Sequence, residues 1–173
     1  MNKSILVTGI SGSGKSFLSE RLEKMGYNAH NIEDIKNLCY WINKKTNRKA
    51  KNYNTDDIKL VKQHDWICDK NKLKKLIRKN PRGIVFYCGI ASNLDDLLPL
   101  FDKTFLLKVN QKVLRKRLSI RTSNKFGRTS EVQKMIFNWK NRWEKHMCEK
   151  GAIPINANHD IGKIVGDIIK KIK

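Results

Sequence analysis

Eight residues near the start of the chain have the types and the spacing to hold phosphate groups. Residues 9–16 read Gly-Ile-Ser-Gly-Ser-Gly-Lys-Ser, which fits the pattern Gly-x-x-x-x-Gly-Lys-Ser/Thr. Glycines let the backbone curl so that successive N–H groups face one centre, and the lysine reaches the outer phosphates. The closing serine hydroxyl suits Mg²⁺. We expect this loop to contact its ligand through Gly9, Ser11, Gly12, Ser13, Gly14, Lys15, Ser16 and the following Phe17.

A strand and a helix must flank such a loop. Residues 3–8 are β-prone, and residues 16–25 place Leu18, Leu22 and Met25 on one helical face. The helix adds the positive end of its dipole to the phosphate site. The alternative is an incidental glycine-rich turn, which these flanking elements disfavour. The loop therefore predicts ATP and Mg²⁺ as ligands, although it does not distinguish a preference for ATP from one for GTP.

Strands and helices alternate along the rest of the chain. Such alternation predicts an α/β three-layer sandwich, in which a five-stranded parallel sheet has helices on both faces. We expect one domain over residues 1–173, with a turn at 80–83 and a helical insertion at 35–80 that folds over the site. The remaining strands are expected at 27–32, 84–88, 103–109 and 153–156, and the remaining helices at about 94–100, 111–122, 130–150 and 161–172.

This order of elements and the loop at 9–16 resemble the nucleoside-monophosphate-kinase-like branch of the P-loop proteins. That branch includes adenylate, shikimate and gluconate kinases, and the resemblance covers nearly the whole chain. Residues 88–93, 126–127 and 151–155 are also similar to small bacterial proteins labelled only as ATPases or kinases. The resemblance implies an ATP- and Mg²⁺-dependent phosphotransferase acting on a nucleoside, a nucleotide or another hydroxyl compound.

The resemblance further implies an acid after the second strand, and Glu33 and Asp34 lie there. Beside Mg·ATP, one carboxylate can face the metal while the other accepts the proton of the acceptor hydroxyl. We expect both acids to be catalytic and to hold the metal together with Ser16, and which of them is the base stays open. The alternative is that they only begin the next helix, where the dipole favours acids.

A glycine turn after the third strand is the next part that the resemblance implies. Gly89 is in place, with Ser92 and Asn93 as acceptor contacts. The chain lacks the triple glycine of shikimate kinases and the Asp-Gly-x-Pro-Arg of adenylate kinases. No acid ends this strand, which moves the expected metal role to Glu33 or Asp34.

Arginines in residues 117–130 resemble the lid of adenylate kinases. Arg117 and Arg121 are four residues apart and so share a helical face. We expect them to be catalytic, with Arg117 also binding the nucleotide, because planar donors match the charge on transferring phosphoryl oxygens. Arg128 is an expected acceptor contact. The alternative is a basic helix face in a very basic protein.

The charge of the chain opens a second class of function. Lys and Arg number 37 against 16 Asp and Glu, a net charge of +21. Such a surface attracts polyanions, so the alternative is an RNA- or DNA-directed P-loop protein such as a polynucleotide kinase. A general bias toward Lys, Asn and Ile explains the same number without such a partner. A third alternative is a nucleotide-dependent ATPase switch.

The remaining residues exclude several kinds of site. The four cysteines are widely spaced, which argues against a zinc site and gives no evidence for a disulfide framework. No apolar run could span a membrane, and Gly9 interrupts the only candidate for a signal peptide. We therefore expect a cytoplasmic location. Trp139 and Trp143 follow core spacing, whereas Trp66 and Asp69 are candidates to line an acceptor pocket.

Overall fold

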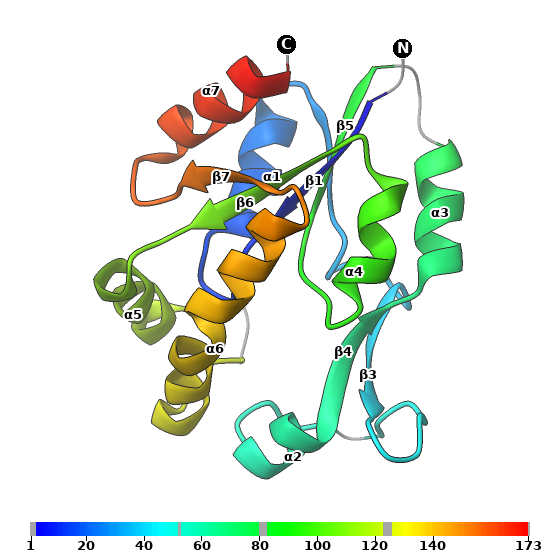
Figure 1. The fold of residues 1–173 in the computed structure, drawn as a ribbon, viewed down its shortest axis with the longest axis vertical. Coiled ribbons are helices and arrows are strands. Elements are labelled where there is room, and N and C mark those ends of the chain that lie inside the picture. Colours follow the sequence, from blue (N-terminus) through cyan, green and yellow to red (C-terminus); the bar gives the residue numbers. More distant parts are fainter. Residues whose placement is uncertain (1–2, 52, 80–82, 123–125, 173) are drawn as a thin grey trace.

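The computed structural model describes residues 3–51, 53–79, 83–122 and 126–172, and its centre is a parallel sheet (Figure 1). The strand order is β2-β5-β1-β6-β7, and every neighbouring pair is parallel. The strand before the phosphate loop therefore lies in the middle, which confirms the expected five-stranded sheet. The strands are β1 (Lys3–Thr8), β2 (Asn28–Asn31), β5 (Ile84–Cys88), β6 (Lys103–Lys108) and β7 (Ile153–Asn156).

Helices cover both faces of this sheet, as the alternation predicts (Figure 1). One face carries α1 (Lys15–Lys24) and α7 (Ile161–Ile172), and the other carries α3 (Lys70–Lys79) and α4 (Leu94–Leu97). A 3₁₀ turn (Leu98–Leu100) follows α4. Helix α5 (Gln111–Ile120) lies beyond the carboxyl end of β6. Helix α6 (Ser130–Glu149) begins in the same region, and its C-terminal end packs with Met147 against the face that carries α3 and α4.

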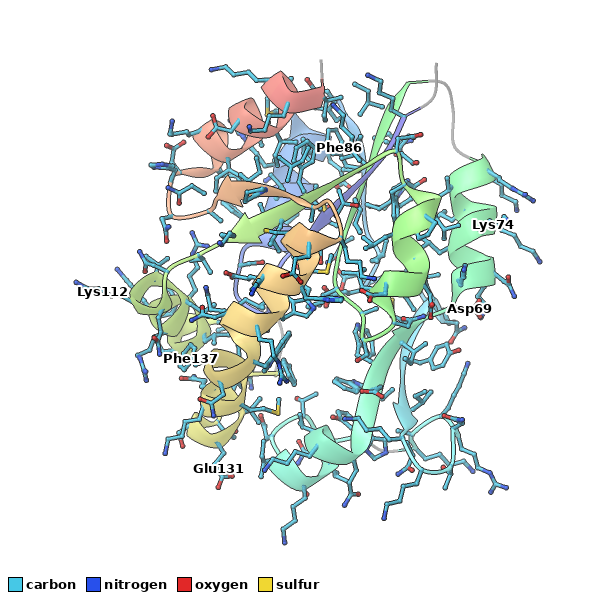
Figure 2. All side chains as sticks on the ribbon, viewed as in Figure 1. Asp69, Lys74, Phe86, Lys112, Glu131 and Phe137 are labelled. Carbon is cyan, nitrogen blue, oxygen red and sulfur yellow. The ribbon has the colours of Figure 1, made fainter. Side chains whose placement is uncertain are left out.

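The central strand is apolar on both sides because both of its faces are buried. Ile5 and Val7 pack into a core that includes Phe86 and the apolar side chains of α1 and α7. Leu6 packs into a second core with Tyr87 and the inner faces of α3 and α4. Figure 2 shows Phe86 among the side chains on the α1 and α7 side. A continuous apolar run is typical of such a strand.

The segment from 35 to 80 is mixed, and the expectation of a helical insertion needs correction. It contains α2 (Ile58–Gln63) and α3, but also a two-stranded antiparallel sheet of β3 (Cys39–Asn43) and β4 (His64–Cys68). The apolar spacing in these two runs mimics a helix, whereas their aromatic and β-branched residues favour strands that pair with each other. The cross-strand pair Trp41–Trp66, with ring centroids 5.2 Å apart, is such a contact.

Two expectations fall partly on residues outside the described ones: residues 80–82 of the expected turn and residues 123–125 of the expected lid. Among the described residues, no helix is long and apolar enough to cross a membrane.

Candidate functional site

The loop between β1 and α1 has the curled backbone that the glycine pattern predicts. Gly12 and Gly14 adopt positive φ angles of 84° and 104°, a region that side chains disfavour. The backbone N of Ser13 donates to the carbonyl of Ile10 at 3.0 Å, which closes the turn. A Cβ on Gly9 would lie 2.5 Å from Ser13 Oγ, so the loop needs glycine there.

Lys15 lies buried at the base of this loop, with only 7% of its surface exposed. Its Nζ donates to the carbonyls of Gly9 at 3.0 Å and Ile10 at 3.3 Å, and lies 3.6 Å from Glu33 Oε1. Burial lowers the pKa of Lys15, and the negative charge of Glu33 opposes that shift. The expected acid and the expected lysine are therefore brought together across the ends of two strands.

Glu33 also connects the turn after β2 to the turn after β5. Its Oε1 accepts a hydrogen bond of 3.1 Å from the backbone N of Ile90. This contact requires a close approach of the two turns, because a Cβ on Gly89 would lie 2.3 Å from Ile32 Cγ1. Gly89 thus lets the two turns approach closely enough for Glu33 to bind Ile90 N, a role that only the tertiary structure reveals.

Asn31 joins the second acid to the expected metal ligand. Its Nδ2 donates to Ser16 Oγ at 3.1 Å and also to Asp34 Oδ2. Ser16 and Asp34 are both exposed, so these oxygens face solvent beside the phosphate loop. Sequence reasoning missed Asn31, although a polar residue at the carboxyl end of a strand was a usable signal.

Arg117 and Arg121 both reach the phosphate loop, as expected. Arg117 Nη1 donates to the carbonyl of Ser13 at 3.1 Å, and its Nη2 to that of Ala157 at 2.9 Å. Arg121 lies in extended backbone just beyond the end of α5, so the expectation that the two arginines share a helical face is wrong. Arg121 donates from Nη1 to Ser11 Oγ at 2.7 Å. Burial lowers the pKa of both arginines, and Glu33 counteracts this at Arg121.

A cavity of about 720 Å³ opens from this cluster toward the β3–β4 pair and α6. Lys15, Ser16, Glu33 and Arg121 line the end at the phosphate loop. Trp66 lines the cavity as expected, and so do Trp139 and Trp143, which also pack against the core. Asp69 is not among its lining residues, since Asp69 Oδ1 instead accepts from the backbone N of Lys72 in α3.

The remaining candidate residues lie around this cluster. Ser92 and Asn93 hold the backbone of β4, because Ser92 Oγ accepts from the N of Trp66 and Asn93 binds both polar backbone groups of Cys68. Of these two, Ser92 also lines the cavity. Arg128 Nη2 donates to the carbonyl of Thr122 at 3.1 Å. Phe17 is 61% exposed at the start of α1 and does not line the cavity.

The donor set fits magnesium bound together with a phosphate ligand. No group of three or more His, Cys, Asp or Glu side chains that could hold a metal occurs among the described residues. Magnesium in phosphate sites takes one or two protein oxygens, and phosphates and waters supply the others. Ser16 Oγ and a carboxylate of Asp34, both bound to Asn31, supply oxygens of that kind.

The sequence of residues 5–138 matches the model of the AAA domain family. The match covers more than half of the chain. The chain belongs to this family of P-loop NTPases. The resemblance to P-loop proteins is thereby confirmed. None of the curated proteins compared with the sequence matches it.

Solved structures show the same fold over nearly the whole chain. A Thermus thermophilus protein, TT1252, has a TM-score of 0.59 at 14% identity over 99% of this chain and 98% of its own. Deoxyadenosine kinase from M. mycoides with bound dATP has a TM-score of 0.56 at 15% identity over 98% of both chains. A sugar kinase from Janibacter sp. has a TM-score of 0.56 at 12% identity over 98% and 94%. The chain therefore has the fold found in P-loop kinases.

Proposed function

We propose that this protein is an ATP- and Mg²⁺-dependent phosphotransferase that moves the γ-phosphate to the hydroxyl of a small molecule. The convergence of Glu33, Lys15 and Arg121 at one end of a deep cavity carries this proposal. A loop that only binds a nucleotide needs neither an acid beside its lysine nor an adjoining cavity for a second substrate. A transferase needs both, since the acceptor must lie in line with the phosphate.

The lysine and the two arginines of the site have different roles toward the phosphates of ATP. Lys15 leaves the carbonyls of Gly9 and Ile10 and binds the outer phosphates, whose negative charge then adds to that of Glu33 beside its Nζ. Arg117 and Arg121 already touch the loop from the α5 side and donate to phosphoryl oxygens as charge develops on them.

The two acids take different roles in this proposal. Glu33 lines the cavity and so accepts the proton of the acceptor hydroxyl. Asp34 is bound through Asn31 to Ser16 and so holds the metal with that serine, directly or through water. When bound, Mg²⁺ neutralises charge on the β- and γ-phosphates.

A coupled assay of ADP release tests the proposal. Purified protein with Mg·ATP is supplied with a panel of nucleosides, nucleotides and other hydroxyl metabolites. We expect at least one acceptor to raise turnover and Lys15→Ala to abolish that rise. Lys24→Ala is the matched control, because Lys24 is exposed at the far end of the same helix.

Two other results would separate the alternatives. Turnover of ATP that no acceptor increases points to the nucleotide-dependent ATPase switch. Turnover raised by the 5′-hydroxyl of an oligonucleotide, with binding that weakens steeply as salt rises, points to the polynucleotide kinase. No specific observation among the described residues favours that second result.

A further inference from the structure

All four tryptophans of the chain line the one cavity beside the phosphate loop. They are Trp41 on β3, Trp66 on β4, and Trp139 and Trp143 on α6. These elements come from distant parts of the chain, so no local pattern explains the gathering. Tryptophan has a large flat ring system, and its contacts contribute most binding energy when another flat ring packs against it.

The aromatic side chains form two groups on two sides of the cavity. On the β3 and β4 side, Trp41 stacks on Tyr53 with centroids 4.2 Å apart and planes 15° apart, and it lies 6.0 Å from Phe126. On the α6 side, Trp139 and Trp143 contact each other edge to face at 5.6 Å. Figure 1 shows α6 and the β3–β4 pair on opposite sides of the molecule's lower half.

The polar groups along this cavity are largely bound to protein partners. Asp95 accepts from His146 Nε2 at 2.9 Å, Asp65 pairs with Lys44 at 3.5 Å, and His64 Nδ1 contacts the carbonyl of Leu60 at 2.8 Å. Ser92 is bound to the backbone of β4, as described above. Because these groups already have partners, a polyhydroxy acid gains less from them than it would from unpaired polar groups.

We infer that the phosphoryl acceptor of this protein is a nucleoside, whose base lies in the aromatic part of the cavity and whose sugar hydroxyl faces Glu33. This inference rests on the proposed function and narrows its acceptor to one chemical class. The base contacts Trp41 and Trp66 on one side and the α6 tryptophans on the other.

The first experiment compares two classes of acceptor. The ribonucleosides adenosine, guanosine, cytidine and uridine, with their 2′-deoxy forms, are tested for ADP release beside gluconate and shikimate, which carry no aromatic ring. We expect one or more nucleosides to be phosphorylated and both acids to be inert. Turnover of an acid with every nucleoside inert would overturn the inference while leaving the proposed phosphotransferase intact.

The second experiment measures the aromatic contacts with a matched pair of variants. Trp139→Leu removes a lining ring, and Phe137→Leu removes a ring from the same helix on the side that contacts Arg115 (Figure 2). We expect Trp139→Leu to raise the KM for the nucleoside about tenfold with kcat and the KM for ATP unchanged. Phe137→Leu should change neither KM. Equal effects of the two variants would contradict the inference.

A binding measurement on the inactive variant Lys15→Ala tests the nucleoside site without any phosphoryl transfer. We expect nucleosides to quench the tryptophan fluorescence of this variant. Quenching without phosphorylation by the wild type would refute only the transferase, whereas no quenching at millimolar nucleoside would refute the nucleoside site.

Discussion

Glu33 Oε1 lies 3.6 Å from Lys15 Nζ while it accepts a 3.1 Å hydrogen bond from the backbone of Ile90. One carboxylate oxygen thus links the turn after β2, the phosphate loop and the turn after β5. Lysine and acid are thus held together at the end of the cavity that lies beside the phosphate loop.

Glu33→Gln tests the role of this acid as a base. Glutamine keeps an oxygen for Ile90 N but cannot take a proton, so we expect kcat for the phosphorylated acceptor to fall at least about 100-fold. Steady-state kinetics should show a much smaller change in the KM for ATP. An unchanged kcat would show that Glu33 is not the base and that it only connects Lys15 to the backbone of Ile90. Asp96→Asn, an exposed carboxylate on α4, is the control.

Asp34→Asn tests the division of labour between the two acids. We expect the Mg²⁺ concentration for half-maximal rate to rise about tenfold or more, because Asp34 and Ser16 share Asn31. A magnesium titration at saturating ATP measures it. If Glu33→Gln shifts the magnesium requirement and Asp34→Asn does not, the two roles are reversed.

A double-mutant cycle tests the close approach at Gly89. A Cβ there would lie 2.3 Å from Ile32 Cγ1 and 2.8 Å from Ile32 Cδ1, so Gly89→Ala should lower the free energy of unfolding by about 1 to 3 kcal/mol. Ile32→Ala removes both atoms, and the double variant should lose less than the sum of the two single losses. Urea unfolding measures all three, and strict additivity would rule out the clash. Gly166→Ala, on α7 with open space around its Cβ, should be stabilising by about 0.5 to 1 kcal/mol.

Cys39 and Cys68 are predicted to form a disulfide under mild oxidation. They lie directly opposite each other, and the Leu38–Asp69 backbone hydrogen bond beside them makes theirs a non-hydrogen-bonded pair, the closer kind. A hydrogen bond between the two thiols raises the pKa of Cys39 and lowers the pKa of Cys68. Because Cys68 is buried and Cys39 is partly exposed, glutathione reacts with Cys39 first and Cys68 then displaces it.

Oxidised glutathione takes the two hydrogens of this pair and leaves as two thiols. Mass spectrometry should show their loss from the wild type and from Cys148→Ser, but not from Cys39→Ser. The closed loop should add about 3.6 kcal/mol to the free energy of unfolding. A mixed disulfide with glutathione that never resolves would show that the pair cannot close.

Alkaline pH should remove a contribution of Cys88 to stability. Burial raises the pKa of the Cys88 thiol to about 12 from its ordinary 9.0. Below pH 9 the thiol is protonated in both states, and its contribution is complete. Between pH 9 and 12 the unfolded chain ionises first, so stability falls by about 1.4 kcal/mol per pH unit. Urea unfolding at pH 8 and 10 should show a smaller loss for Cys88→Ala than for the wild type, and equal losses would contradict the prediction.

The donor half of the site could be predicted because its pattern is local. Residues 9–16 make their own turn, and the glycine positions that need positive φ are fixed by neighbours a few residues away. The parallel sheet could be predicted for a similar reason, since β1 and β5 are apolar runs bounded by turn residues. Arg117 and Arg121 both contact this loop, but Arg121 lies in extended backbone just beyond α5, so a shared helical face does not explain its contact.

Apart from Trp66, most of the cavity lining could not be predicted, because it depends on contacts between segments far apart in the chain. Cross-strand pairing made strands of residues 39–43 and 64–68, whose apolar spacing also fits a helix. Asn31 gained its role from meeting Ser16 and Asp34, and Gly89 from the packing of Ile32.

The sequence alone thus determined a phosphate-binding loop on a parallel α/β sheet. Local backbone preference and the periodicity of apolar residues suffice for that. Only the tertiary structure decided that four tryptophans meet in one cavity, because their meeting depends on how β3, β4 and α6 pack.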